Sequence, residues 1–445
     1  MLYLAFRWVV TWLLKAFYRL ETVADPHHAL ALKGPVIFVA NHPNGLVDPG
    51  MILMLARRKV TFLAKAPLFK MPVIGSLVRG LGALPVYRKQ DDPAQMSGNE
   101  GTLTAAVEGL KGGRAITLFP EGKSHSEPQL AELKTGCARI ALEACRQGAR
   151  VHIVPVGLTY DEKNRFRSAV RVDVGAPLEA AHFLEAPGED AFAAAKTFTS
   201  RIADALLSVT LNVEKWEDLP LLKTAEALYA LKKGETEGDA ERLRAFASGM
   251  ALLRREQPQR YQMLREQVQA FARRLRTVNI TPHALGIEYR PAQVFRFVVR
   301  NIFALFIGLP LFLAGMVLFC VPYFIPRIAV KMFPVDDDVE ATVKVLFTLL
   351  LVPLWWVVLT VLAAMCWGTY VALGVGLLAL PLAFFTRYFL ERRREAAVDV
   401  RTFLLMMSRA QLKASLSFEG TLLAAKIEQL VQELQPRLTP NFNSS

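Results

Sequence analysis

His42 and Asp48 are the residues whose types and spacing are best suited to chemistry in this chain. His42 follows a short apolar segment, and Asp48 comes six positions later in Asn-His-Pro-Asn-Gly-Leu-Val-Asp-Pro. A neutral imidazole accepts a proton near pH 7, and a carboxylate on its other ring nitrogen fixes the tautomer and stabilises the imidazolium. The pair therefore predicts a general base and its orienting acid. Asp48 also precedes Pro49, which is typical of a helix N-cap, and the two roles can coexist.

Three further segments follow His42 in an order that suits one site: Gly82–Arg88, Phe119–His125 and Val154–Gly157. Together with the first block, they resemble the phospholipid/glycerol acyltransferase family over roughly residues 36–174, most specifically at Phe-Pro-Glu-Gly. Members of this family move a fatty acyl group from a thioester onto a glycerol-phosphate hydroxyl. Here five residues rather than four separate His42 from Asp48, and Lys-Ser-His replaces the usual Thr-Arg after Phe-Pro-Glu-Gly. In both respects the sequence resembles the branch of the family that acts on glycerol 3-phosphate or dihydroxyacetone phosphate.

The resemblance implies that the second and third blocks bind the acceptor, which carries over to Gly82, Arg88, Glu121 and Gly122. A phosphate dianion also needs fixed positive charge. Arg88 offers a planar fork that matches two phosphate oxygens, and Lys123 offers a point charge. Lys65 and Lys134 are weaker candidates for the same pocket.

The remaining members of these blocks are expected to support the site. Glu121 either holds the glycerol hydroxyls or pairs with Arg88, and Gly122 is expected to adopt a backbone conformation or a close approach closed to other residues. His125 is a candidate supporting donor rather than the base. The apolar Val154–Gly157 block forms either a wall for the acyl chain or a core strand.

The expected reaction is acyl transfer from acyl-CoA or acyl carrier protein to glycerol 3-phosphate or dihydroxyacetone phosphate. No covalent acyl-enzyme, cofactor or metal is implied, and the four cysteines lack the spacing of a zinc site. The alternative acceptor is lysophosphatidate or another lysophospholipid. The non-enzyme alternative is an inactive lipid-binding membrane protein, against which the intact His42, Asp48 and Phe-Pro-Glu-Gly argue.

Composition indicates a membrane protein. The 445 residues are 53% hydrophobic and carry a net charge of +13. Long apolar runs favour anionic lipid over nucleic acid as the partner of this charge, and no nucleic-acid-binding module is recognisable.

Residues 30–212 are expected to form an α/β acyltransferase domain, a mixed sheet flanked by helices. Short apolar segments alternate there with helical patterns. The predicted strands are Val36–Ala40, Val60–Ala64, Leu84–Tyr87, Ala115–Phe119, Val151–Leu158 and Val170–Val174. The predicted helices lie near Pro49–Arg57, Thr102–Lys111 and Lys134–Arg146.

Four other regions are expected to be helical. Polar residues at four-residue spacing predict an interfacial amphipathic helix over 1–22. A helical hairpin is expected over 213–290, C-terminal transmembrane helices over 295–390 and an amphipathic tail over 391–445. Basic flanks favour a first apolar run that dips in and returns, a second run that forms a hairpin turning near Cys366–Gly368, and an active site on the cytoplasmic face.

Overall fold

The computed structural model describes residues 2–438 except 72–73, 89–96, 185–189, 279, 287–290, 333–335 and 409. The chain forms two compact units. The first contains Met1–Asn212 together with Phe333–Leu346, and the second contains Val213–Met332 and Phe347–Ser445. The first unit is thus assembled from two stretches that are far apart in the sequence.

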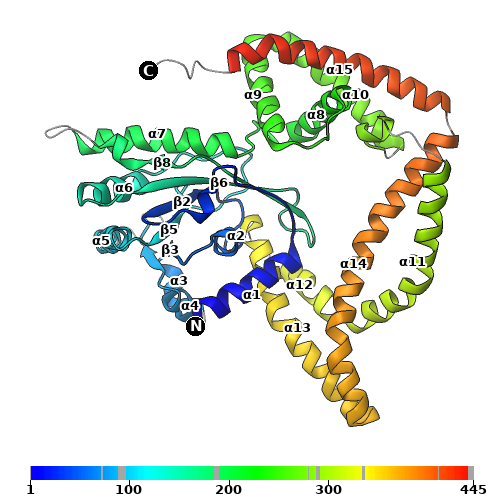
Figure 1. Cartoon of the computed structure of the whole chain (residues 1–445), viewed down its shortest axis with the longest axis horizontal. Coiled ribbons are helices and arrows are strands. Elements are labelled where there is room, and N and C mark those ends of the chain that lie inside the picture. Colours follow the sequence, from blue (N-terminus) through cyan, green and yellow to red (C-terminus); the bar gives the residue numbers. More distant parts are fainter. Residues whose placement is uncertain are drawn as a thin grey trace. The chain divides into compact units, whose positions relative to one another are not determined.

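A mixed sheet forms the centre of the first unit, in the order β1–β7–β6–β2–β5–β3–β4, with β8 paired to β6 (Figure 1). The strands are β1 (Arg19–Ala24), β2 (Val36–Ala40), β3 (Val60–Lys65), β4 (Leu84–Val86), β5 (Ala115–Leu118), β6 (His152–Tyr160), β7 (Ala169–Val174) and β8 (Leu178–Glu179). Strands β6, β2, β5, β3 and β4 are parallel, whereas β7 is antiparallel to β6. All six predicted strands are present, so the predicted α/β class is confirmed.

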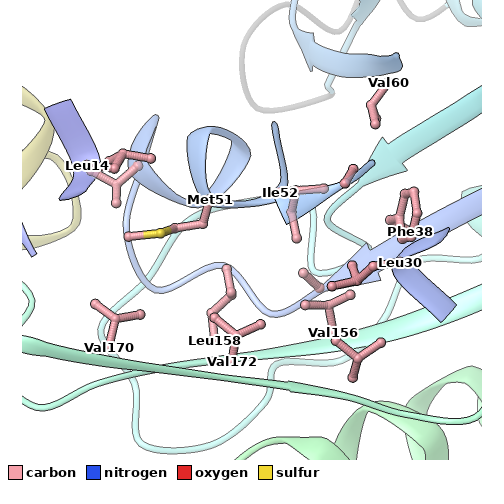
Figure 2. Close-up of a cluster of buried hydrophobic side chains, with 14 of the residues drawn as sticks. Leu14, Leu30, Phe38, Met51, Ile52, Val60, Val156, Leu158, Val170 and Val172 are labelled. Carbon is pink, nitrogen blue, oxygen red and sulfur yellow. The ribbon is translucent and has the colours of Figure 1, made fainter. Parts of the chain in front are cut away.

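Helices cover both faces of this sheet. One core cluster joins α1 (Leu2–Phe17) and α2 (Val47–Leu55) to the sheet, and the other joins α5 (Gly98–Lys111), α6 (Gly136–Arg146) and α7 (Ala191–Val209). Strand β2 contributes alternate residues to the two clusters, because successive side chains of a strand point to opposite faces. Figure 2 shows the first cluster, in which Met51 and Ile52 of α2 lie over Val156 and Leu158 of β6. Short helices α3 (Pro67–Lys70) and α4 (Ile74–Gly80) connect β3 to β4.

Helix α1 is shorter than predicted. It ends at Phe17, because Arg19–Ala24 pairs with β7 as the edge strand β1. Its buried side, which includes Leu14, packs in the first core cluster. Its exposed side carries Leu4, Trp8 and Trp12, at the four-residue spacing that places side chains on one face of a helix.

The second unit contains a bundle of amphipathic helices. Two helices follow the Gly234–Gly238 turn as predicted, α9 (Ala240–Glu256) and α10 (Pro258–Val278). The same core also includes α8 (Leu219–Lys233) and α15 (Ala410–Leu438). The bundle therefore joins the expected hairpin region to the expected tail.

Apolar helices complete the second unit: α11 (Pro291–Leu318), α12 (Cys320–Met332), the part of α13 (Asp337–Trp367) that begins at Phe347, and α14 (Thr369–Ser408). Val299–Leu318, Asp337–Trp367 and Thr369–Arg393 are long and apolar enough to cross a membrane. The predicted turn near Cys366–Gly368 is present at Gly368 (φ 85°). The first run is helical through Pro310 and breaks at Phe319. Helix α14 continues past residue 391, where the tail was expected to begin.

Candidate active site

The predicted pair is assembled at the carboxyl end of β2. Nδ1 of His42 lies 2.8 Å from Oδ2 of Asp48. The Asp48 side chain has no exposed surface, whereas 16% of the His42 side chain remains exposed. Among the described residues Nε2 of His42 has no hydrogen-bond partner, so this nitrogen is available to take a proton. The geometry is that of a base oriented by a carboxylate.

Asp48 does not act as the expected helix N-cap. Helix α2 begins at Val47, and Leu46 occupies the N-cap position without a side-chain cap. The Asp48 carboxylate instead receives the backbone N–H of Asn44 on Oδ2 at 2.7 Å and the hydroxyl of Tyr160 on Oδ1 at 2.7 Å. Both oxygens of a buried carboxylate need donors, and these two groups together with the imidazole supply them.

The imidazole and backbone of His42 are fixed by the third block. The ring stacks on Phe119, with centroids 4.0 Å apart and an interplanar angle of 18°. The N–H of His42 donates to Oε1 of Glu121 at 2.8 Å, and its carbonyl accepts from the backbone N–H of His125 at 3.1 Å. The third block therefore positions the base directly.

Glu121 has partners other than those expected. Its carboxylate is buried, and besides His42 it accepts the backbone N–H of Ala131 at 2.8 Å and a hydrogen bond from Nε2 of His125. Nδ1 of His125 accepts from the N–H of Glu127, so Nε2 carries the donated proton. Glu121 thus positions the backbone of His42, and His125 donates to Glu121 in the supporting role that the sequence predicted.

Three cationic residues gather around Gly122. Arg88, which follows β4, donates to the Gly122 carbonyl at 3.1 Å. Lys123 is the next residue and is exposed, and a Cβ on Gly122 would lie 3.6 Å from Cγ of Lys134. Gly122 has φ +76°, a left-handed conformation that disfavours other residues, which is one of the two roles expected of it. The second and third blocks therefore meet at a positively charged loop.

Two further predicted positions have simpler environments. Gly82 lies in the exposed turn before β4, and Lys65 ends β3 with an exposed side chain.

Val154 and Val156 of the fourth block are fully buried on β6, which pairs with β2. Of the two interpretations of this block, the structure supports a core strand.

Two tyrosines that the sequence analysis missed complete the site. Tyr160, at the carboxyl end of β6, donates to Asp48. The Tyr18 hydroxyl accepts from Nδ2 of Asn44 at 2.9 Å and donates to the carbonyl of Lys163 at 2.6 Å. Burial raises the pKa of both phenols above the ordinary value, so both hydroxyls stay protonated donors at neutral pH. Tyr160 reaches Asp48 because β6 lies beside β2 and parallel strands end at the same edge of the sheet, an arrangement that the sequence alone does not give.

Comparison with known proteins supports the same region. Residues 17–159 match the family model described as Acyltransferase. An uncharacterized acyltransferase of Schizosaccharomyces pombe is 26% identical over 50% of this chain and 46% of its own length. Glycerol-3-phosphate O-acyltransferase 1 of Saccharomyces cerevisiae is 27% identical over 50% of this chain and 41% of its own length. A 1-acyl-sn-glycerol-3-phosphate acyltransferase of Bacillus subtilis is 27% identical over 31% of this chain and 63% of its own length.

The resemblance found in the sequence is thus confirmed for the segment that carries the four blocks. The chain spans less than half the length of the first curated relatives that it matches. The crystal structure of the 1-acyl-sn-glycerophosphate acyltransferase of Thermotoga maritima aligns over 45% of this chain and 78% of that chain, with 19% identity and a TM-score of 0.33.

Proposed function

We propose that this chain is a membrane O-acyltransferase that moves a fatty acyl group from a thioester to a hydroxyl of glycerol 3-phosphate or dihydroxyacetone phosphate. The observation that carries the proposal is the 2.8 Å contact between His42 and Asp48 within a segment that matches the acyltransferase family. The five-residue spacing between them and the relatives named glycerol-3-phosphate O-acyltransferase favour this acceptor class. The three apolar helices fit a membrane protein.

In the proposed mechanism Nε2 of His42 takes the proton of the acceptor hydroxyl. At the same time the oxygen of that hydroxyl attacks the carbonyl carbon of the thioester. Asp48 stabilises the imidazolium, and Tyr160 and the N–H of Asn44 donate to the oxygens of Asp48 and fix their orientation. Collapse of the tetrahedral intermediate breaks the C–S bond, and the imidazolium returns its proton to the thiolate. The products are an ester and a free thiol.

The acceptor phosphate is assigned to the positively charged loop at Gly122. Arg88 is already oriented there by its bond to the Gly122 carbonyl. Lys123 makes no hydrogen bond or ion pair with the residues that the structure describes, so its ammonium is available to an anion. The side chain of Lys134 passes beside the same glycine, with Cγ 3.6 Å from the position of a Cβ on Gly122. Together these charges provide the electrostatic complement of a phosphate dianion.

A lysophosphatidate acceptor is the second candidate, and the relatives named 1-acyl-sn-glycerol-3-phosphate acyltransferase favour it. A thiol-release assay on the purified protein separates the candidates. Glycerol 3-phosphate, dihydroxyacetone phosphate and lysophosphatidate are compared with acyl-CoA and with acyl carrier protein as donors. We expect the highest kcat/KM with one of the first two acceptors. A higher kcat/KM with lysophosphatidate would show that lysophosphatidate is the acceptor. The absence of thiol release with all three acceptors would overturn the proposal.

A further inference from the structure

The first turns of α13, residues 337–346, belong to the first unit and lie against the loops of the candidate active site. These loops follow three neighbouring parallel strands: residues 42–46 follow β2, residues 124–126 follow the turn after β5, and residues 161–167 follow β6. Each loop makes a side-chain bond to this end of α13. A segment distant in sequence therefore contacts the edge of the sheet at which the proposed chemistry occurs.

The loop that carries the base makes the closest approach. The backbone N–H of Leu46 donates to Oγ1 of Thr342 at 3.1 Å, and Thr342 is buried. A Cβ on Gly45 would lie 2.9 Å from the Asp338 carbonyl and 2.9 Å from the Thr342 hydroxyl. Such contacts are too short for real Cβ atoms, so only glycine permits this approach. Gly45 is one of the five residues that separate His42 from Asp48.

Lys163 joins the three loops to α13. Its ammonium donates to the Pro43 carbonyl at 2.8 Å and to the Ser126 hydroxyl at 2.5 Å, and it lies 3.0 Å from Oδ2 of Asp337. Only 14% of the Lys163 side chain is exposed. Hydrogen bonds to charged groups in such a shielded setting are stronger than neutral ones at the surface.

Other bonds reinforce the same contact. Ser126 donates to Oδ2 of Asp337 at 2.6 Å, Ser124 donates to Asp338, and the Lys344 ammonium donates to the Asn164 carbonyl at 2.8 Å. Ser124 belongs to the Lys-Ser-His sequence that replaces the usual Thr-Arg of the resembled family. This departure therefore has a structural use, since it provides a hydroxyl for α13.

We propose that residues 337–346 and Lys163 are positioning elements of the active site, which hold the loop 42–46 so that His42 and Asp48 keep their geometry. The proposal rests on the proposed function. A displacement of about 1 Å in a reacting group lowers a rate by up to about 100-fold, so loss of one tether is expected to lower kcat more than it changes substrate binding.

The test compares matched variants of the full chain in detergent or lipid. Thr342→Val removes the acceptor for the Leu46 N–H without changing size, whereas Thr342→Ser keeps the hydroxyl. Lys163→Met removes the ammonium, and its control is Arg165→Met, which lies on the same loop and loses only an exposed pair with Glu162. We expect Thr342→Val and Lys163→Met each to lower kcat about tenfold, with both KM values changed by less than about twofold. Thr342→Ser and Arg165→Met should resemble the wild type.

An activity-independent measurement accompanies the kinetics. Amide hydrogen exchange in the peptide covering residues 42–48 should accelerate in Thr342→Val and Lys163→Met and remain unchanged in both controls. If Lys163→Met does not fold, the comparison of Thr342→Val with Thr342→Ser still tests the positioning role. Unchanged exchange and unchanged kcat in Thr342→Val would overturn the positioning role. An inactive wild type with accelerated exchange in the variants would instead reject the proposed function and retain the tether.

Discussion

The sheet of the first unit and the apolar helices of the second unit follow opposite rules of burial. In the first unit, β2 is fully buried, and charged side chains such as Asp48 and Glu121 are buried with donors for their oxygens. In the second unit, the apolar helices leave large side chains exposed, including Leu350 at 72% and Tyr370 at 92%. Such surfaces are stable where the surrounding medium is hydrocarbon. The first unit is organised around polar groups that must be satisfied, and the apolar helices of the second around contact with lipid.

The largest expected effect tests the chemistry of the first unit. His42→Ala should lower kcat by about 100-fold or more, the scale for loss of a general base. The measurement is thiol release at saturating substrates, with His125→Ala as the comparison because that histidine supports Glu121. If folded His42→Ala turns over at nearly the wild-type rate, another group is the base.

A matched pair of truncations tests the contrast in burial. Ile52 is fully buried in the first unit, and Ile52→Ala should destabilise that unit by about 2–5 kcal/mol. Leu350→Ala removes a similar side chain from an exposed position on α13 and should change stability by less than about 0.5 kcal/mol. Thermal unfolding in the same detergent measures both. Equal losses would show that Leu350 is covered by protein.

The next effect concerns the positively charged loop. Arg88→Ala should raise the KM for a phosphorylated acceptor about tenfold and leave kcat nearly unchanged, because the charge acts on phosphate binding. Arg88→Lys should restore only part of the affinity, since an ammonium cannot form a fork. A rise in KM for the thioester, with the acceptor KM constant, would assign Arg88 to the donor side.

The smallest expected effect concerns Tyr160. Tyr160→Phe removes one donor from Asp48 and makes that carboxylate a stronger acceptor for the imidazole. The acidic limb of the pH–rate profile should move upward by less than about one pH unit, with kcat lowered a few-fold. The raised pKa of Tyr160 also implies a stability that is present below about pH 10 and declines above it, because the unfolded phenol ionises first. An unchanged profile would reduce Tyr160 to a packing role.

The sequence was informative where local spacing determines geometry. The continuous apolar run Val36–Ala40 predicted β2, and His42 and Asp48 lie close enough in the chain for one loop to bring them together. The edge strand β1 was missed because half of Arg19–Ala24 is polar and the segment follows a helical pattern. Tyr160 and Thr342 were missed for another reason: each reaches the catalytic loop through tertiary contact, which no short motif encodes.

The membership of residues 336–346 in the first unit has a consequence for counting membrane crossings. Asn212 and Asp336 belong to the same compact unit, so we expect them to lie on the same side of a bilayer. The chain between them must therefore cross an even number of times. Helix α12 has 13 residues, about 20 Å, which is too short to return across a hydrocarbon core of about 30 Å.

If α11 crossed the membrane fully, α12 would be too short to provide the return crossing that an even number requires. The end of α11 also meets α13 part-way along its length, where Nε1 of Trp355 donates to the Leu318 carbonyl at 2.6 Å. Single cysteines placed at 336 and at 368 should react with an impermeant reagent from opposite sides. By this parity we expect α11 and α12 to enter and leave through one leaflet, and α13 and α14 to form a pair of full crossings.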